Sequence, residues 1–313
     1  MKIGSLHAGI GGFSIAFENL KVNTLWANEI DKNACKTYRE NFSHKLYEGA
    51  IEDLNIEKLE KVDILTSGFP CQAFSIAGER KGFKDERGNQ FFEVMKIVDV
   101  IKPKVIFFEN VKNLHTHDGG RTFKIMFKNI RDAGYDIKYS ILNTKDYGNL
   151  PQNRERIYVV CFRKDINSDN FKFPAPIKRT KKIAGVLETE VEEKYYYRED
   201  KYNYKELKEA VTKYDTCYQW RRIYVRENKN NVCPTLTANM GTGGHNVPII
   251  LTKKGIRKLT PRECFRIQGY PESYIFPEKM ANSHLYKQVG NTVSVPIVER
   301  IAKNIIEVLL SSS

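Results

Sequence analysis

The sequence predicts an α/β fold in which a largely parallel sheet carries helices on both faces and is joined to a second, smaller domain. Over the first half of the chain, short apolar runs alternate with segments of helical spacing, and this alternation is typical of parallel sheets. The alternation stops near residues 173–176, which contain two prolines, and it returns at Leu259. A chain of 313 residues is long enough for one large domain or two domains.

The regular part of the chain contains apolar runs that we expect to form strands, each followed by a turn or by a helical pattern. The expected strands are residues 2–6, 24–29, 62–66, 104–109, 137–142 and 156–162. The expected helices begin near Phe13 and span residues 32–41, 89–101, 122–133 and 295–310.

Residues 174–257 are rich in tyrosine, polar and irregular, and we expect them to form the smaller domain. The whole chain has 51 Lys and Arg against 38 Asp and Glu, a net charge of +13. Positive charge is concentrated in residues 216–258, which hold Arg221, Arg222, Arg226, Lys229, Lys253, Lys254, Arg257 and Lys258 against the acid Glu227. This distribution favours a polyanionic partner, nucleic acid first and a membrane surface second, although a solvated basic face would show the same charges.

Other features limit the class of protein. No apolar run is long enough to cross a membrane, and the N-terminus lacks the pattern of a secretory signal. The six cysteines are far apart and form no CxxC pair, so we expect reduced thiols, a cytoplasmic protein and no zinc or other metal site. His115 and His117 have no neighbours that would complete a metal site, and a solvated loop explains them better.

The motif Phe69-Pro70-Cys71-Gln72 follows the expected strand 62–66. A thiol at the carboxyl end of a central strand lies where α/β folds place their chemistry. Most free cysteines are small buried hydrophobic residues, so Cys71 alone would not indicate a nucleophile. Its significance depends on the motifs that accompany it.

A glycine-rich turn, residues 7–13, links the first strand to the first helix. Glycines let the backbone approach a ligand closely, and a helix N-terminus favours polar ligand groups. Glu29 ends the second strand and could accept hydrogen bonds from ribose hydroxyls. Together these features indicate a cofactor that contains adenosine, although nicotinamide cofactors use similar loops and Glu29 alone could be a surface carboxylate.

Two further motifs stand at strand ends. Glu109 follows four apolar residues, and burial beside a neighbouring site would make its carboxyl group a candidate proton donor. Arg154 and Arg156 precede the strand 156–162 and could hold a base or a phosphate by bidentate hydrogen bonds. An ordinary strand terminus and two solvated arginines are the simpler alternatives.

These motifs, in this order, resemble the DNA cytosine-5 methyltransferases of bacterial restriction–modification systems. The resemblance extends from the first expected strand to the last helix. The matching blocks are residues 8–13, 28–31, 68–72, 82–88, 109–111, 152–156, 259–264 with 268–271, and 288–292.

The resemblance implies a Rossmann-like sheet that binds S-adenosylmethionine and releases S-adenosylhomocysteine, with no metal. The catalytic domain would comprise residues 1–174 and 285–313, and a smaller, irregular, mostly β target recognition domain would comprise residues 175–284. The implied partner is double-stranded DNA, which a monomer would methylate to protect it from a restriction endonuclease.

The resemblance also implies roles for individual residues. Cys71 would attack carbon 6 of a flipped-out cytosine, and Glu109 would protonate or hydrogen-bond ring nitrogen 3. Arg154 would contact the base, and Arg156 would lie beside it. Cofactor contacts would come from His7, Ala8, Gly9, Gly11, Gly12, Phe13, Glu29, Ile30, Ile51, Phe69, Pro70 and Asn291. DNA contacts would come from Gln72, Ser75 and Arg87 near the thiol and from Arg221, Arg222, Arg226, Thr237, Gly243 and Gly244 in the recognition domain.

The chain departs from the family pattern at three positions near the cofactor. The family usually has an acidic residue at Ser5, a phenylalanine at His7 and often an aspartate at Ala50. We expect these changes to affect cofactor affinity rather than the catalytic residues. An imidazole at His7 can still stack on an adenine.

Three alternative functions account for part of the sequence. A nicotinamide oxidoreductase would explain the glycine turn and Glu29, but not Cys71 or the basic segment. A non-catalytic nucleic-acid-binding protein would explain the charge, but it needs no thiol, carboxylate and arginine at neighbouring strand ends. An RNA cytosine-5 methyltransferase of the same fold is the nearest alternative, and the long recognition segment favours duplex DNA over RNA.

Overall fold

The computed structural model describes residues 1–70, 90–201, 203–221, 223–242 and 246–311, and the chain divides into two compact units. Unit 1 comprises Met1–Leu142, Glu155–Pro174 and Val298–Ser313, and unit 2 comprises Asn143–Arg154 and Ala175–Ile297. Among the helices of these ranges, none is long and apolar enough to cross a membrane.

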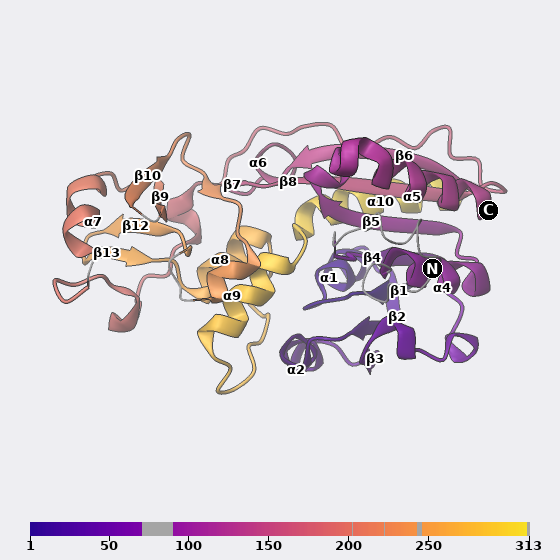
Figure 1. Ribbon diagram of the computed structural model, residues 1–313, viewed down its shortest axis with the longest axis horizontal. Coiled ribbons are helices and arrows are strands. Elements are labelled where there is room, and N and C mark those ends of the chain that lie inside the picture. Colours follow the sequence, from indigo (N-terminus) through magenta and orange to yellow (C-terminus); the bar gives the residue numbers. More distant parts are fainter. Residues whose placement is uncertain (71–89, 202, 222, 243–245, 312–313) are drawn as a thin grey trace. The chain divides into compact units, whose positions relative to one another are not determined.

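Unit 1 is built on a seven-stranded sheet with the order β3-β2-β1-β4-β5-β8-β6 (Figure 1). The strands are β1 (Lys2–Leu6), β2 (Asn23–Glu29), β3 (Lys45–Glu48), β4 (Ile64–Ser67), β5 (Val105–Val111), β6 (Tyr135–Asn143) and β8 (Glu155–Arg163). Neighbouring strands from β3 to β5 are parallel, whereas β8 runs antiparallel to β5. The predicted α/β fold is confirmed, with a mixed rather than a fully parallel sheet.

Helices cover both faces of this sheet. Successive residues of a strand point to opposite sides, so neighbouring residues of β5 contact different helices. Phe107 packs against Phe13 and Phe17 of α1, with ring centroids 5.3 and 6.5 Å away. Its neighbour Phe108 packs against Phe91 of α4, at 6.3 Å. The large buried cluster on the α4 side also includes Met126 and Ile130 of α5.

The helices agree with the segments expected from the sequence to within about two residues wherever a pattern was recognised, which is the usual uncertainty of helix ends. The α-helices are α1 (Gly12–Glu18), α2 (Lys32–Asn41), α4 (Gln90–Ile101), α5 (Arg121–Asp132), α6 (Thr144–Tyr147), α7 (Tyr204–Ala210), α8 (Pro261–Gln268), α9 (Asn282–Asn291) and α10 (Val295–Ser311). Short 3₁₀ turns are η1 (Ile51–Asp53), η2 (Ile56–Lys58), η3 (Lys112–His115), η4 (His117–Gly120), η5 (Ile183–Val186), η6 (Glu193–Tyr195) and η7 (Ala238–Gly241).

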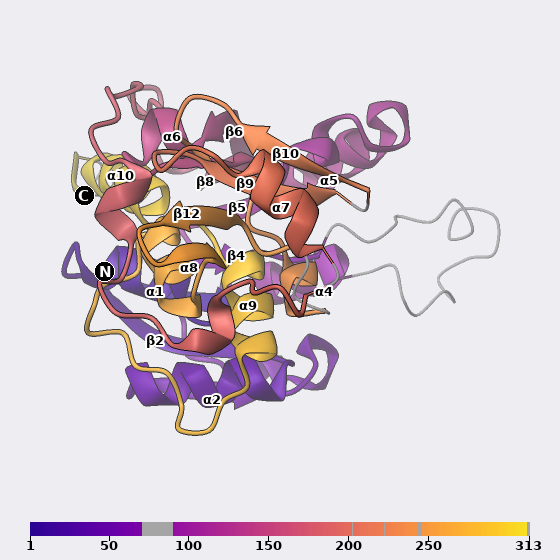
Figure 2. The same ribbon diagram turned by 90° about the vertical axis from the view of Figure 1, so that its left-hand side faces the viewer.

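Unit 2 contains a four-stranded antiparallel sheet with the order β10-β9-β12-β13, and α7 packs against it (Figure 2). Its strands are β9 (Cys217–Arg221), β10 (Tyr224–Asn228), β12 (Ile249–Thr252) and β13 (Gly255–Lys258), and a separate parallel pair joins β7 (Gln152–Asn153) to β11 (Cys233–Pro234). In β9 the side chains of Tyr218 and Trp220 enter a small hydrophobic core with Leu207 of α7, so Gln219 and Arg221 point the other way.

The block 259–264 has a structural role in unit 2. Thr260 is the N-cap of α8, Pro261 is its first residue, and Glu263 completes a capping box. The Glu263 carboxylate also forms a fully buried, bidentate ion pair with Arg257, at 2.6 and 2.8 Å. This pair fixes the start of α8 against β13.

Candidate active site

Glu109 forms a largely buried ion pair on the large sheet. It lies inside β5 rather than at its end, because the strand continues to Val111. In the antiparallel ladder Val111 is opposite Arg156 of β8, so Glu109 and Arg156 are diagonal neighbours. The Arg156 Nε lies 3.3 Å from Glu109 Oε1, and the two side chains are only 13% and 9% exposed.

Asn110 connects this strand to the Phe-Pro-Cys motif. Its side-chain amide donates to the carbonyl oxygen of Phe69 at 2.8 Å, and its own carbonyl oxygen accepts from the backbone N–H of Val111. Phe69 is buried against Phe91 and Phe108. The chain is therefore fixed beside β5 up to two residues before Cys71. Cys71 itself lies outside the described residues, as do Gln72, Ser75 and Arg87.

Arg154 belongs to unit 2, where its guanidinium group binds backbone carbonyls. It donates to Leu236 at 2.8 Å, to Thr292 at 2.7 Å and, through both terminal nitrogens, to Gly290 at 3.3 Å. The side chain is 2% exposed. These bonds hold the chain before Thr237 against the end of α9, a role that we did not predict from the sequence.

Two neighbours of Arg154 strengthen this anchor. The Gln152 side chain accepts from the backbone N–H of Leu236 at 3.1 Å and donates to Gln268 at 3.0 Å. A Cβ atom at Gly290 would lie 2.2 Å from the backbone carbon of Thr237, so only glycine permits this approach. The motifs around Arg154 and Gly290 thus position one loop of unit 2.

The glycine turn before α1 has the geometry of a ligand cradle. Gly9 and Gly11 have φ angles of 56° and 81°, which glycine adopts readily. A Cβ atom at Gly9 would meet nothing within 4 Å in the described chain, whereas one at Gly11 would collide with the Phe42 ring at 2.2 Å. The backbone at Gly9 therefore faces open space.

Glu29 supports this turn through its carboxylate. One oxygen accepts from the backbone N–H of Gly9 at 2.7 Å, and the other accepts from Ile30 and Asp31 at 3.0 and 2.8 Å. A carboxylate has about four acceptor positions. The oxygen that binds Gly9 therefore retains a position for a ligand hydroxyl.

The other residues expected at the cofactor differ in exposure. Ile30 is 64% exposed beside the turn, and Pro70 is also exposed. Gly12 and Phe13 begin α1 and are buried, and Ala8 and Ile51 are also buried. Asn291 is exposed as the last residue of α9 in unit 2. His7 places its ring between Ser67 and Gln90, with hydrogen bonds of 3.0 and 2.7 Å.

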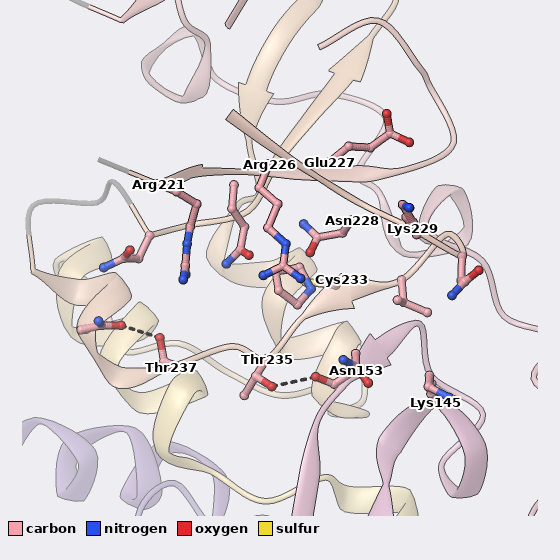
Figure 3. A pocket seen from close by; sticks show the side chains of 16 residues that line it. Lys145, Asn153, Arg221, Arg226, Glu227, Asn228, Lys229, Cys233, Thr235 and Thr237 are labelled. Atoms are coloured by element: carbon pink, nitrogen blue, oxygen red, sulfur yellow. Dashed lines mark hydrogen bonds between the residues drawn. The ribbon is translucent and has the colours of Figure 1, made fainter. Parts of the chain in front are cut away.

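Unit 2 also contains a polar groove of about 660 Å³ below the β9–β10 hairpin (Figure 3). Arg221 and Gln219 from β9, Arg226 and Asn228 from β10, and Thr235 near β11 line it. Gln219 and Arg226 are directly opposite each other in the ladder, on the face away from the core.

The charge of the groove is predominantly positive. Its acid, Glu227, is paired with Lys213 at 2.9 Å, and Lys145 is paired with Asp146. Arg221, Arg226 and Lys229 supply the remaining cationic groups.

Of the base-reading residues expected from the sequence, Arg221, Arg226 and Thr237 line this groove. Arg222, Gly243 and Gly244 lie outside the described residues. Gln219 also lines the groove and was not among the expected residues, although its alternation with Tyr218 and Trp220 is a period-2 signal. In the described ranges no group of His, Cys, Asp and Glu is arranged to hold a metal ion.

Comparison with known proteins places these features in a family. The protein-family model described as C-5 cytosine-specific DNA methylase matches residues 1–307. The Type II methyltransferase M.Bsp6I of Bacillus sp. (strain RFL6) is 54% identical, covering 99% of this chain and all of that protein. The Type II methyltransferase M.HhaI of Haemophilus parahaemolyticus is 40% identical, covering 96% of this chain and 92% of that protein.

Solved structures agree at the level of the fold. The Dnmt2 methyltransferase of S. pombe superposes with a TM-score of 0.75 over 99% of each chain, at 19% sequence identity. A putative DNA modification methyltransferase encoded within a prophage of E. coli superposes with a TM-score of 0.71 over 99% of each chain, also at 19% identity.

Proposed function

The chain belongs to the C-5 cytosine-specific DNA methylase family, and we propose that it methylates carbon 5 of a flipped-out cytosine in a specific short sequence of duplex DNA. The observation that carries the proposal is the buried Glu109–Arg156 pair. Asn110, next to Glu109, holds the carbonyl of Phe69, two residues before Cys71 in the sequence. A carboxyl group and a guanidinium group are thereby available to a base that the thiol attacks.

In this proposal Cys71 is the nucleophile and acts as a thiolate. Its sulfur bonds to carbon 6 of the cytosine ring while Glu109 delivers a proton to nitrogen 3, so the electron pair gathers at carbon 5. Carbon 5 takes the methyl group and then loses its proton to a base, so that the electron pair expels the Cys71 thiolate. The proton on nitrogen 3 returns to Glu109. The cytosine must leave the helix, because carbon 6 is not accessible inside a base-paired duplex.

We assign the base-contacting arginine to Arg156. The sequence had favoured Arg154, but the Arg154 guanidinium is bonded to the carbonyls of Leu236, Gly290 and Thr292. Arg156 instead has its guanidinium beside the Glu109 carboxylate. It can orient that carboxyl group and donate to the base from the same fork. Arg154 then acts by positioning the loop at Leu236 and Thr237, which we call the recognition loop.

The residues of the glycine turn fit the adenosine portion of S-adenosylmethionine. The open backbone at Gly9, the free acceptor position of Glu29 and the exposed Ile30 supply close approach, a ribose contact and an apolar surface. When bound, the cofactor supplies an electrophilic methyl group on sulfur. The chain's own contribution is to hold that group at a fixed place near the base.

The groove of unit 2 is proposed to read the DNA sequence. Arginine pairs with guanine and glutamine with adenine through two hydrogen bonds each in the major groove. Gln219 and Arg226, opposite each other across the hairpin, offer the groups for both pairings. Arg221 and Lys229 add positive charge for the phosphates.

Bisulfite sequencing of DNA from cells that express the chain tests this function and gives the target motif. We expect one short motif with a methylated cytosine, and no methylation in cells that express a Cys71→Ser variant. Cleavage of the same DNA by a restriction endonuclease specific for the motif should be blocked. Unmodified cytosines throughout the DNA of cells that contain folded protein would contradict the proposal.

A further inference from the structure

His7, the first residue of the glycine turn, has an unusual backbone conformation. Its φ angle is 51°, in the left-handed region that residues with a side chain rarely adopt. Such a conformation persists only where the surrounding structure holds it. The contacts of the imidazole ring supply that support, because both ring nitrogens are hydrogen-bonded.

The two partners of His7 come from different elements. Nδ1 lies 3.0 Å from the hydroxyl of Ser67, the last residue of β4. Nε2 lies 2.7 Å from the side-chain carbonyl oxygen of Gln90, the first residue of α4. In the sequence, Cys71 lies between these two partners. The His7 ring thus connects the end of β4, the start of α4 and the glycine turn.

The hydrogen bonds have a single direction that fixes the tautomer. The Gln90 amide nitrogen donates to Glu52 at 2.6 Å, which turns the Gln90 carbonyl oxygen toward His7. Because that oxygen only accepts, His7 Nε2 carries the proton and Nδ1 accepts from the Ser67 hydroxyl. The chain Ser67–His7–Gln90–Glu52 is fully satisfied with a neutral ring. Burial lowers the pKa of His7, which outweighs the raising effects of the Gln90 bond and of Glu29 and Glu52.

We propose that His7 is a positioning residue that fixes the position of the glycine turn relative to the end of β4 and the start of α4. The inference rests on the proposed function, because the consequence of this placement is the geometry between methyl donor and thiol. A phenylalanine at this position would keep an aromatic ring but would lose both hydrogen bonds. The role therefore depends on the imidazole nitrogens and not on ring stacking.

The test is a double-mutant cycle on the rate of a single methyl-transfer turnover at saturating cofactor and DNA. His7→Phe and Gln90→Leu each remove the same hydrogen bond, from opposite sides. We expect each to slow the turnover about tenfold, the usual effect of one lost hydrogen bond, with the KM for DNA unchanged. The double variant should be no slower than the slower single variant, because both act through one interaction.

Matched controls separate this role from a general loss of stability. Lys96 is an exposed residue of α4, the helix that Gln90 begins, and its side chain pairs with Glu93. Lys96→Met should keep the wild-type rate. Gln90→Leu leaves the turn itself intact, so it reports on the interaction even where His7→Phe folds poorly. Multiplicative rate losses in the double variant, or a wild-type rate in Gln90→Leu, would overturn the inference. Failure of the wild-type protein to methylate DNA would instead remove the proposed function.

Discussion

At the scale of single residues, we propose that the Glu109–Arg156 pair is the centre of the chemistry. Replacement of Glu109 by Gln keeps the shape of the side chain but removes its proton and charge. We expect Glu109→Gln to slow a single methyl-transfer turnover at least about 100-fold, the usual contribution of a general acid, without weakening DNA binding. Transfer of labelled methyl groups to a duplex measures this. Glu155→Gln is the control, because Glu155 forms an exposed pair with Lys112; equal rates for both variants would refute the assignment.

A second residue-scale prediction concerns pH and stability. Burial lowers the pKa of His44 from 6.5 to about 4, so its ring is neutral in the folded protein at pH 7. Between pH 6.5 and 4 the unfolded chain binds the proton and the folded chain does not. As the pH is lowered from 6.5 towards 4, the free energy of unfolding should therefore fall by about 1.4 kcal/mol per pH unit from this residue, and above pH 6.5 this loss should be absent.

Chemical denaturation at pH 7, 6 and 5 checks this effect. A His44→Asn variant loses a hydrogen bond to Tyr38 at every pH, but its stability should depend less on pH than that of the wild-type protein. Parallel pH curves for the wild type and His44→Asn would exclude the role of this histidine.

The sequence located Glu109 and both arginines but could not divide their roles. A carboxylate inside an apolar strand and two arginines before the next strand are visible as patterns. Arg154 binds carbonyls of residues 82 to 138 positions later, and backbone acceptors leave no signature in the side-chain sequence. The partner of Arg156 follows from the antiparallel register of β5 and β8, whereas we had expected a largely parallel sheet.

At the scale of elements, the β9–β10 hairpin is proposed to select the target sequence. We expect Arg226→Ala to weaken binding of the cognate duplex by about 10- to 100-fold and to relax selection at one base pair. Lys229→Ala should weaken binding of all sequences alike and reduce the dependence on salt. Fluorescence anisotropy on cognate and altered duplexes separates the two effects. A uniform loss for Arg226→Ala would place that residue on the phosphates instead.

The close contact between α9 and the recognition loop gives another element-scale prediction. An alanine at Gly290 would force apart backbone atoms of Thr237 and Ala238 that lie 2.2 to 2.4 Å from its Cβ. We expect Gly290→Ala to cost about 1–3 kcal/mol of stability and to weaken DNA binding. Thermal unfolding measures the first effect. Gly185→Ala is the control, since a Cβ atom there meets nothing within 4 Å in the described chain; similar melting temperatures for both variants would refute the clash.

Sequence patterns identified most elements of unit 1 and few of unit 2. The strands of the large sheet are apolar runs, because both of its faces are buried. The edge strand β3 was missed, since its four residues are half-buried or exposed. In unit 2, β9 alternates aromatic and polar residues. Because the neighbouring sequence is also rich in tyrosine and polar residues, this alternation was not recognised as a strand.

At the scale of the whole molecule, the chain passes between its two units more often than the sequence suggests. Asn143–Arg154 lies between segments of unit 1 but belongs to unit 2, because Gln152 and Arg154 bond to residues near Leu236 and Gly290. That residues 175–284 form the target recognition domain remains a prediction. The net charge of +13 agrees with a molecule whose substrate is a polyanion.

The most direct test of the central claim is covalent trapping on a duplex in which 5-fluorocytosine replaces the target cytosine. Fluorine at carbon 5 prevents the final proton loss, so the bond between Cys71 and carbon 6 should persist after methyl transfer. With S-adenosylmethionine present, the wild-type protein and a Cys35→Ala control should form an adduct that survives denaturation and maps to Cys71. Cys71→Ser should form none. An adduct with the Cys71→Ser variant, or its absence from wild-type protein on a motif that this protein methylates, would contradict the mechanism.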